Sequence, residues 1–300
     1  MPTVSAGNDV SICSGTITTL SATGSGTFQW NANASGLISS GAVMAVGLRK
    51  LLPGYTGPAI RLRRSSDNAE SDFGFVGNDL DLAAISAWLG GNSGYCTTIY
   101  DQSGSGNNIT QSTVLHQPLY FSGAINGKPV IRFNATQFMA NNTNFAPPYT
   151  IVYGAKQTGP ARERVLSSVN NNWLLGWHSG YKKAAFFMGW VAPPNIAADN
   201  NTYIYTGTST GSVSHFYENG NVIATNSNGT AGPNGIRLNG YGTGSGFELS
   251  DVDFLDVVAY NSVLAASARQ ATEAGISMYP NPISGQIIQL AFTDQPKGLY

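Results

Sequence analysis

The chain has 300 residues, a formal net charge of −1, 36 glycines and only 10% charged residues. Soluble domains usually carry about 25% charged residues, so this composition is typical of an extracellular all-β protein rich in turns. The largest basic cluster, Arg61, Arg63 and Arg64, is too small to form a surface for nucleic acid or anionic lipid. The longest apolar runs are far shorter than the ~20 residues that cross a bilayer. We therefore expect neither nucleic acid as a partner nor insertion into a membrane.

The cysteines and histidines indicate neither a metal site nor a cofactor. Cys13 and Cys96 are the only cysteines, and no CxxC pair or histidine cluster lies beside them. A disulfide between the two is one alternative in an exported protein, and two unpaired thiols are the other. Their spacing in the sequence does not decide between these alternatives.

Residues 1–40 are expected to be the remnant of a repeat followed by a linker. They lack the basic start and apolar core of a signal peptide. Residues 6–30, AGNDVSICSGTITTLSATGSGTFQW, resemble the first strands of immunoglobulin-like repeats in large secreted surface proteins of Bacteroidetes. This resemblance stops after about 25 residues, which are too few to close a sandwich.

Three short elements are predicted between residues 42 and 91. Residues 42–52 have helical periodicity and end at the turn pair Pro53-Gly54. Residues 60–64 form a strand whose arginines are expected to pair with the acids that follow it rather than to bind a substrate. Asp79 is predicted to cap a helix that gains from Asp81 in its first turn and ends at Gly90 or Gly91. Capping explains the two acids better than a calcium site, because two carboxylates supply too few oxygen ligands for calcium. The acids after the strand are Asp67, Glu70 and Asp72.

Residues 97–111, TTIYDQSGSGNNITQ, are predicted to be a strand that runs into a fixed turn. Together with Gln117-Pro118 and NGKPVIRF at 126–133, they resemble the opening of concanavalin A-like jelly-roll domains. With IRLRRSSDNAESDFGF at 60–75, they are similar to the catalytic domain of α-L-arabinofuranosidase B, glycoside hydrolase family 54, and to related domains of unassigned activity. The resemblance implies an all-β, concanavalin A-like (LamG or jelly-roll) β-sandwich with a few short helices over residues 41–275.

The rest of the chain alternates between strands and turns, which is typical of a sandwich. Asn219-Gly220 predicts a tight hairpin, and residues 263–274 predict a closing helix. Residues 276–300, with the signature Tyr279-Pro280-Asn281-Pro282, resemble the start of a C-terminal sorting domain of the type IX secretion system. The predicted strands are 129–134, 149–157, 164–169, 173–177, 184–191, 202–208, 213–218, 221–225, 236–239 and 253–260.

Catalytic residues cannot be assigned from the resemblance. A glycosidase needs two carboxyl groups facing each other across the scissile bond, whereas the glycine-rich loop 239–246 and the region 184–194, which match the family's acid and nucleophile, hold no acid. The family's adjacent cysteine pair is also missing. Of the later acids, Glu248, Asp251, Asp253 and Asp256 form a cluster that could hold a catalytic pair. Against this, Asp253 and Asp256 are predicted to point to opposite faces of one strand and could not act together. Glu218 is predicted to be a solvated rim residue.

Aromatic side chains around residues 173–190 suggest a carbohydrate-binding site, because sugars pack on exposed aromatic faces. Core packing is the alternative for Trp173 and Trp177, which share one strand face. The candidate binding residues are Trp177, His178, Tyr181, Trp190 and Tyr241.

The function expected from these observations is a secreted or cell-surface carbohydrate-binding or adhesion module without catalytic activity, from a Bacteroidetes-type bacterium. Its partners would be a glycan and, through residues 276–300, the type IX secretion machinery. One alternative is a glycoside hydrolase of the α-L-arabinofuranosidase B type, acting on an arabinose-containing polysaccharide. The other alternative is a structural spacer of a large surface adhesin.

Overall fold

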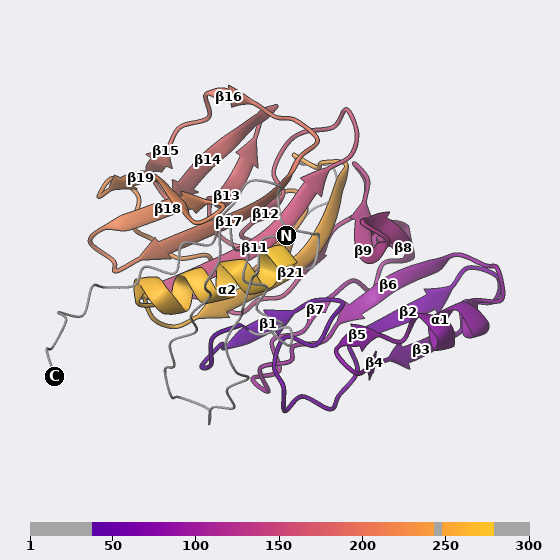
Figure 1. Ribbon diagram of the computed structural model, residues 1–300. Helices are drawn as coiled ribbons and strands as arrows, with labels where there is room; N and C mark the ends of the chain where they lie inside the picture. The colour runs from indigo at the N-terminus through magenta and orange to yellow at the C-terminus, as the bar shows by residue number, and fades with distance from the viewer. Residues whose placement is uncertain (1–37, 243–247, 279–300) are drawn as a thin grey trace, which may run out of the picture. The chain divides into compact units, whose positions relative to one another are not determined.

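The structure is a computed structural model that describes residues 38–242 and 248–278 (Figure 1). Within these residues, 19 strands join in one network of hydrogen-bonded pairs, and β4 (Phe75–Val76) and β5 (Asp79–Leu80) form a separate pair. The prediction of an all-β sandwich with a few short helices is confirmed. No helix in the described part of the chain is long and apolar enough to cross a membrane.

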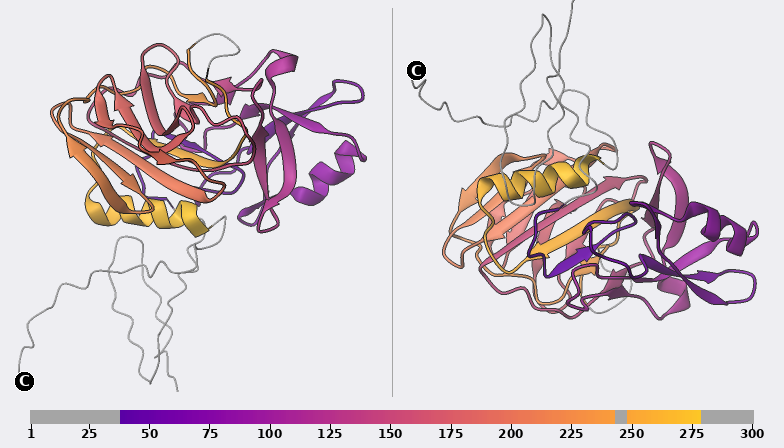
Figure 2. Two further views of the ribbon diagram at one scale, coloured as in Figure 1. Left: turned by 90° about the horizontal axis from the view of Figure 1, so that it is seen from above. Right: turned by 60° about the horizontal axis from the view of Figure 1, so that its bottom comes forward.

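One sheet of the sandwich is built around β21 (Val252–Tyr260), in which every residue is buried. It pairs with β11 (Tyr149–Gln157) along one edge and with β1 (Met44–Val46) and β9 (Lys128–Phe133) along the other. β17 (Thr202–Ser209), β18 (Ser214–Glu218) and β19 (Asn221–Asn226) extend the sheet beyond β11. The helix α2 (Ala266–Met278), yellow in Figures 1 and 2, packs against β11 and β17, which explains why β21 and its neighbours are buried on both faces.

The second sheet centres on the hairpin of β13 (Trp173–His178) and β14 (Tyr181–Phe187). It continues through β12 (Leu166–Ser167), β20 (Arg237–Leu238), β10 (Met139–Ala140) and β7 (Ile109–Thr110) on one side, and β15 (Trp190–Ala192) and β16 (Ile196–Ala197) on the other. Aromatic rings join the two sheets, with centroids 6.3 Å apart for Tyr149 and Trp173 and 6.2 Å apart for Tyr153 and Trp177. Both tryptophans are fully buried, so the core alternative for them is confirmed.

A third group of strands extends from the sandwich through β6 (Gly94–Ile99). This strand pairs with β2 (Ile60–Arg64), β7 and β8 (Leu119–Ile125), and β3 (Glu70–Phe73) pairs with β2. The helix α1 (Leu82–Leu89) buries Ile85 and Leu89 in the same core, and the short helix η1 (Val114–His116) lies between β7 and β8 in the chain. The expected ion pairs form between Arg61 and Asp72 and between Arg64 and Asp67.

The turn after β6 is held by side chains, as the sequence predicts. The Asp101 carboxylate accepts the N–H groups of Ala45, Ser103 and Asn107 at 2.8–2.9 Å. The Gln102 amide accepts the Leu51 N–H, also at 2.8 Å. Both side chains are buried, so this turn fixes the segment that contains β1 rather than presenting catalytic groups.

Three local predictions are wrong. Residues 42–52 contain strand β1 instead of a helix, because their apolar residues are buried in the sheet beside β21, and a short apolar run does not distinguish a buried strand from a helix. Asp81, not Asp79, caps α1, its carboxylate accepting the Ala84 N–H. The strand predicted over 184–191 is split at Met188, whose φ is +60°, where the Gly189 backbone lies too close to Asn228 to leave room for a Cβ.

Other local predictions are confirmed. α1 ends at Gly90 in the left-handed conformation, and Asn219 and Gly220 both have the positive φ values that a type I′ hairpin requires. Residues 1–37 and 279–300, which include most of the proposed immunoglobulin-like remnant, the sorting signature and Cys13, lie outside the described residues. The domain boundaries 1–40, 41–275 and 276–300 therefore remain predictions.

Candidate functional site

The structure brings three of the five predicted binding residues together. The His178 and Trp190 rings are 5.9 Å apart, and the Arg164 guanidinium, which neighbours His178, lies 4.2 Å from the Tyr241 ring centroid. Tyr181 is 43% exposed and faces His178 across the end of the β13–β14 hairpin. Trp177 is fully buried in the core, so it cannot bind a ligand at the surface, and its inclusion in the site was wrong.

The centre of this region is an ion pair between Arg164 and Glu248, which we call the Arg164–Glu248 site. The Arg164 Nε donates to the Glu248 carboxylate, and its Nη1 donates to the Asn172 side chain at 2.7 Å. The Arg164 backbone N–H donates to the Glu248 carbonyl at 2.9 Å, so the two residues are joined through their main chains as well as through their side chains. The Arg164 side chain is only 5% exposed, whereas that of Glu248 is 34% exposed and accessible to a ligand.

Glu248 has a backbone conformation that ordinary residues rarely adopt. Its φ is +51°, in the left-handed region that favours glycine. Strained backbone of this kind costs of order 1–3 kcal/mol and often occurs at binding and catalytic sites. The carboxylate therefore lies at a defined place directly after the glycine-rich loop.

A second carboxylate, that of Glu163, lies near the same imidazole. It accepts the Ser179 N–H at 3.1 Å, and the Glu163 backbone N–H donates to the Ser250 hydroxyl at 2.8 Å. In the described part of the chain the Glu163 carboxylate has no ion pair with a lysine or arginine. Glu163 and Glu248 thus differ: one carboxylate is bonded to a guanidinium and the other is not.

His178 lies between these opposing charges. Burial lowers its pKa below the ordinary 6.5 and the Arg164 guanidinium lowers it further, while the carboxylates of Glu248 and Glu163 act in the opposite direction. The His178 Nδ1 is 3.5 Å from the Glu248 carboxylate, too far for a good hydrogen bond. His178 is therefore neutral at neutral pH and can exchange hydrogen bonds with an uncharged ligand.

The other acids of the late strands have structural partners. Asp253 pairs with Arg132 at 2.7 Å and Asp256 with Arg49 at 2.8 Å, which confirms that these two acids do not act together. The expectation that Glu218 is a solvated rim residue is wrong, because its side chain is only 11% exposed and bonds Lys183 at 2.8 Å. Within residues 38–242 and 248–278, no group of three or more histidine, cysteine, aspartate or glutamate side chains is suited to a metal ion.

Two residues of the site were missed by the sequence analysis. Glu163 and Arg164 belong to an irregular segment before β12, because the strand predicted over 164–169 is limited to Leu166–Ser167. The available signal was composition, since the run Arg162-Glu163-Arg164 places three charges together in a chain with only 10% charged residues.

Comparisons with known proteins show that the first third of the chain is similar in sequence to part of a catalytic domain. Residues 36–135 match the family model described as "Alpha-L-arabinofuranosidase B, catalytic". A probable α-L-arabinofuranosidase B of Aspergillus terreus is 34% identical over 102 residues, which cover 32% of this chain and 20% of that protein. An α-L-arabinofuranosidase of Hypocrea jecorina is 32% identical over 98 residues, 26% of this chain and 20% of the relative. The matched segment thus spans about a fifth of these curated relatives.

Solved structures extend the likeness to most of the chain. A family 54 arabinofuranosidase soaked with a cyclic sulfate inhibitor superimposes with a TM-score of 0.59, covering 78% of this chain and 62% of that chain at 14% identity. An arabinofuranosidase complexed with arabinofuranosyl-α-1,2-xylobiose gives a TM-score of 0.57 over the same shares. The fold is shared with these enzymes.

The expectation of a non-catalytic carbohydrate-binding module is overturned by these matches. The most specific similarity in the sequence is to a catalytic domain, and the curated relatives that share it are named as arabinofuranosidases. These matches therefore favour the alternative of a glycoside hydrolase.

Proposed function

We propose that this chain is a glycoside hydrolase domain of the α-L-arabinofuranosidase B type that removes arabinofuranosyl residues from a polysaccharide. The observation that carries the proposal is the match of residues 36–135 to the family model of the catalytic domain. The shared fold and the two carboxylates beside His178 support it.

The two carboxylates differ in a way that suits the two roles of a glycosidase. One must act as an acid that protonates the leaving oxygen, and the other must be ionised to support the positive charge that develops at the anomeric carbon. Glu248 carries out the second role, because the Arg164 guanidinium compensates its charge and fixes its position. The other role, as the acid next to the leaving oxygen, is assigned to Glu163, the second carboxylate beside His178.

The neighbouring rings would orient the sugar. Trp190 and Tyr241 are both partly exposed, and the parts of their rings that His178 and Arg164 leave uncovered are where the C–H groups of a sugar ring would pack. The neutral imidazole of His178 can donate or accept a hydrogen bond with a sugar hydroxyl. Both acids lie outside the regions 239–246 and 184–194, which were matched to the family's catalytic positions, so their roles rest on the geometry around His178.

The direct test is hydrolysis of 4-nitrophenyl α-L-arabinofuranoside by the purified full chain. Glu248→Gln and Glu163→Gln should each lower the rate at least about 10²-fold, the usual contribution of such a group. Asp67→Asn, which changes an exposed carboxylate outside the site, is the matched control and should leave the rate unchanged. Equal activity of both glutamine variants and the wild type would exclude this pair, and no release of nitrophenol by the wild-type chain would reject the proposed activity.

We also infer that the protein acts outside the cell, exported through the type IX secretion system. The low charge content and the resemblance of residues 276–300 to a sorting domain support this inference. Replacing Tyr279-Pro280-Asn281-Pro282 with four alanines in the native host should shift the protein from the surface fraction to the periplasm. An unchanged distribution would contradict the proposed route.

A further inference from the structure

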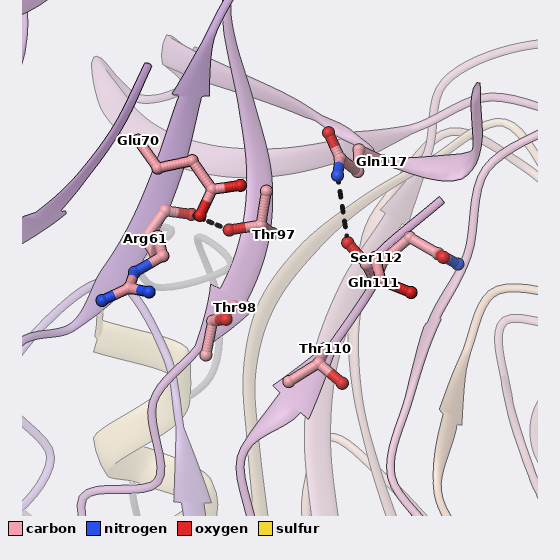
Figure 3. A pocket seen from close by; sticks show the side chains of 8 residues that line it. All are labelled: Arg61, Glu70, Thr97, Thr98, Thr110, Gln111, Ser112 and Gln117. Atoms are coloured by element: carbon pink, nitrogen blue, oxygen red, sulfur yellow. Dashed lines mark hydrogen bonds between the residues drawn. The ribbon is translucent and has the colours of Figure 1, made fainter. Parts of the chain in front are cut away.

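A pocket of about 250 Å³ lies at the point where β6 changes partners, among strands distinct from those of the Arg164–Glu248 site (Figure 3). β7 is paired with β6 at Thr98 and Thr110, and β8 is paired with it at Tyr95 and Leu119. The chain between them leaves the sheet and returns, which opens a fork beside β6. Figure 3 shows Glu70, Arg61 and Thr98 on one side of this pocket and Ser112 and Gln117 on the other.

The rear of this fork pocket is rigid. The buried Gln117 side chain accepts a hydrogen bond from Arg63 at 2.6 Å and donates to the Gln111 carbonyl at 3.1 Å. The buried Gln111 side chain donates to the Phe138 carbonyl and accepts the Thr113 N–H, both at 2.9 Å. These amides use their hydrogen-bonding groups within the protein, so the pocket keeps its shape when it is empty.

Other groups of the fork pocket have unused hydrogen-bonding capacity. The hydroxyls of Thr98, Thr110 and Ser112 and the carboxylate of Glu70 form no side-chain hydrogen bond with the described residues. The only cation of the pocket, Arg61, is held by two hydrogen bonds to Asp72 at 2.7 and 2.8 Å. The pocket thus offers three hydroxyls and one carboxylate, and its positive charge is already compensated.

This chemistry selects the ligand. An anion would be repelled because the two carboxylates of Glu70 and Asp72 outnumber the single cation Arg61 that they act on, and an apolar ligand would cover hydroxyls without bonding them, which is unfavourable. A carboxylate can accept two hydrogen bonds from neighbouring hydroxyls of a sugar, and the threonine and serine hydroxyls can both donate and accept. The volume is below the ~300–1,000 Å³ of pockets for drug-sized ligands, so it suits a single sugar unit.

We propose that the fork pocket binds one neutral sugar unit of a polysaccharide, as a second site distinct from the Arg164–Glu248 site. The two sites share no residue. The helix η1, in the chain between the lining residues Ser112 and Gln117, carries two exposed apolar side chains, Val114 and Leu115. These can contact the C–H face of the next sugar along a chain. The second site goes beyond the proposed hydrolysis and does not depend on it.

The test is affinity gel electrophoresis of the full chain in arabinoxylan, followed by titration with xylobiose and L-arabinose. The variant Thr98→Val/Thr110→Val keeps the shape of both side chains and removes two hydroxyls, and Glu70→Gln removes the charge. We expect each variant to bind at least about threefold more weakly, in line with the loss of hydrogen bonds. Thr113→Val, an exposed threonine next to the pocket, is the matched control and should bind like the wild type.

Measurements on Glu248→Gln separate this proposal from the proposed hydrolysis. That variant should be retarded in the gel like the wild type, since the fork pocket is intact. Ser112→Trp, which fills the pocket from an exposed position, should reduce retardation at least as much as the other pocket variants while hydrolysis of the small nitrophenyl substrate is unchanged. The second site would be overturned if all pocket variants were retarded like the wild type and unfolded at its temperature. It would also be overturned if Glu248→Gln alone lost retardation.

Discussion

Replacing Arg164 with methionine tests how the proposed site is held. The change keeps most of the side-chain volume and removes the guanidinium that bonds Glu248 and Asn172. Hydrogen bonds to charged groups are worth about 1.5–3 kcal/mol, which corresponds to a loss of roughly 10- to 150-fold in kcat/KM if the contact is needed for the reaction. The assay is hydrolysis of the nitrophenyl arabinofuranoside.

The same variant has a second, independent readout in the imidazole of His178. Arg164 lowers the pKa of His178, so Arg164→Met should raise it, whereas Glu248→Gln should lower it further because Glu248 acts in the opposite direction. NMR titration of the imidazole C–H signals, assigned with His178→Gln, measures both shifts. Arg164→Lys keeps the positive charge, so the pKa should stay low while kcat/KM falls.

Two results would refute this reasoning about Arg164. An unchanged pKa of His178 in Arg164→Met would show that the guanidinium does not act on the imidazole. Wild-type kcat/KM in the same variant would show that the ion pair with Glu248 is not needed to position the carboxylate. A variant that is merely unstable would instead unfold at a lower temperature than the wild type. Comparison with Arg164→Lys distinguishes this case.

Further predictions concern stability. Asp256→Asn should lower the free energy of unfolding, measured by urea denaturation, by about 3–5 kcal/mol, because it removes the carboxylate that pairs with the buried Arg49 guanidinium. A loss below about 1 kcal/mol would contradict this. Asp72→Asn breaks a pair of exposed side chains and should cost less than about 1 kcal/mol at neutral pH. The hydrogen bond to Arg61 lowers the pKa of Asp72 below 3.8. The stability that the Asp72 carboxylate contributes is therefore present above pH 3.8 and is lost as the pH falls through the lowered pKa. Asp72→Asn should be less sensitive to acid in that range, and an acid transition like that of the wild type would contradict this assignment. Gly176→Ala should destabilise the fold by about 1–3 kcal/mol, because its Cβ would lie 2.2 Å from the Tyr153 hydroxyl; thermal unfolding at the wild-type temperature would disprove this.

The sequence was most informative where local chemistry determines the structure. The hairpin turn at Asn219-Gly220 follows from the preference of asparagine and glycine for positive φ, and both residues have it. Trp173 and Trp177 lie on one strand face as the alternation indicates, although alternation alone could not say whether that face is buried. Their burial depends on Tyr149 and Tyr153, which come from the opposite sheet.

Long-range pairing explains what could not be predicted. Residues 44–46 are a strand only because β21, more than 200 residues later, provides the partner edge. Glu163 and Glu248 become neighbours of His178 through contacts between three separate segments, none of which carries a recognisable motif. Glu218 is drawn out of solvent by Lys183 and Tyr205, which lie on different strands.

The central position of β21 also determines how the chain can fold. Its two edges pair with strands that begin at Met44, Lys128 and Tyr149, so the sheet cannot be completed until residues 252–260 have been synthesised. Contacts so distant in sequence are associated with slow folding. A fragment that ends near residue 135 would expose the edges of β1 and β9 and would be prone to aggregate. The segment that most resembles known enzymes therefore lacks the strand that covers the edges of β1 and β9 until residues 252–260 have been synthesised.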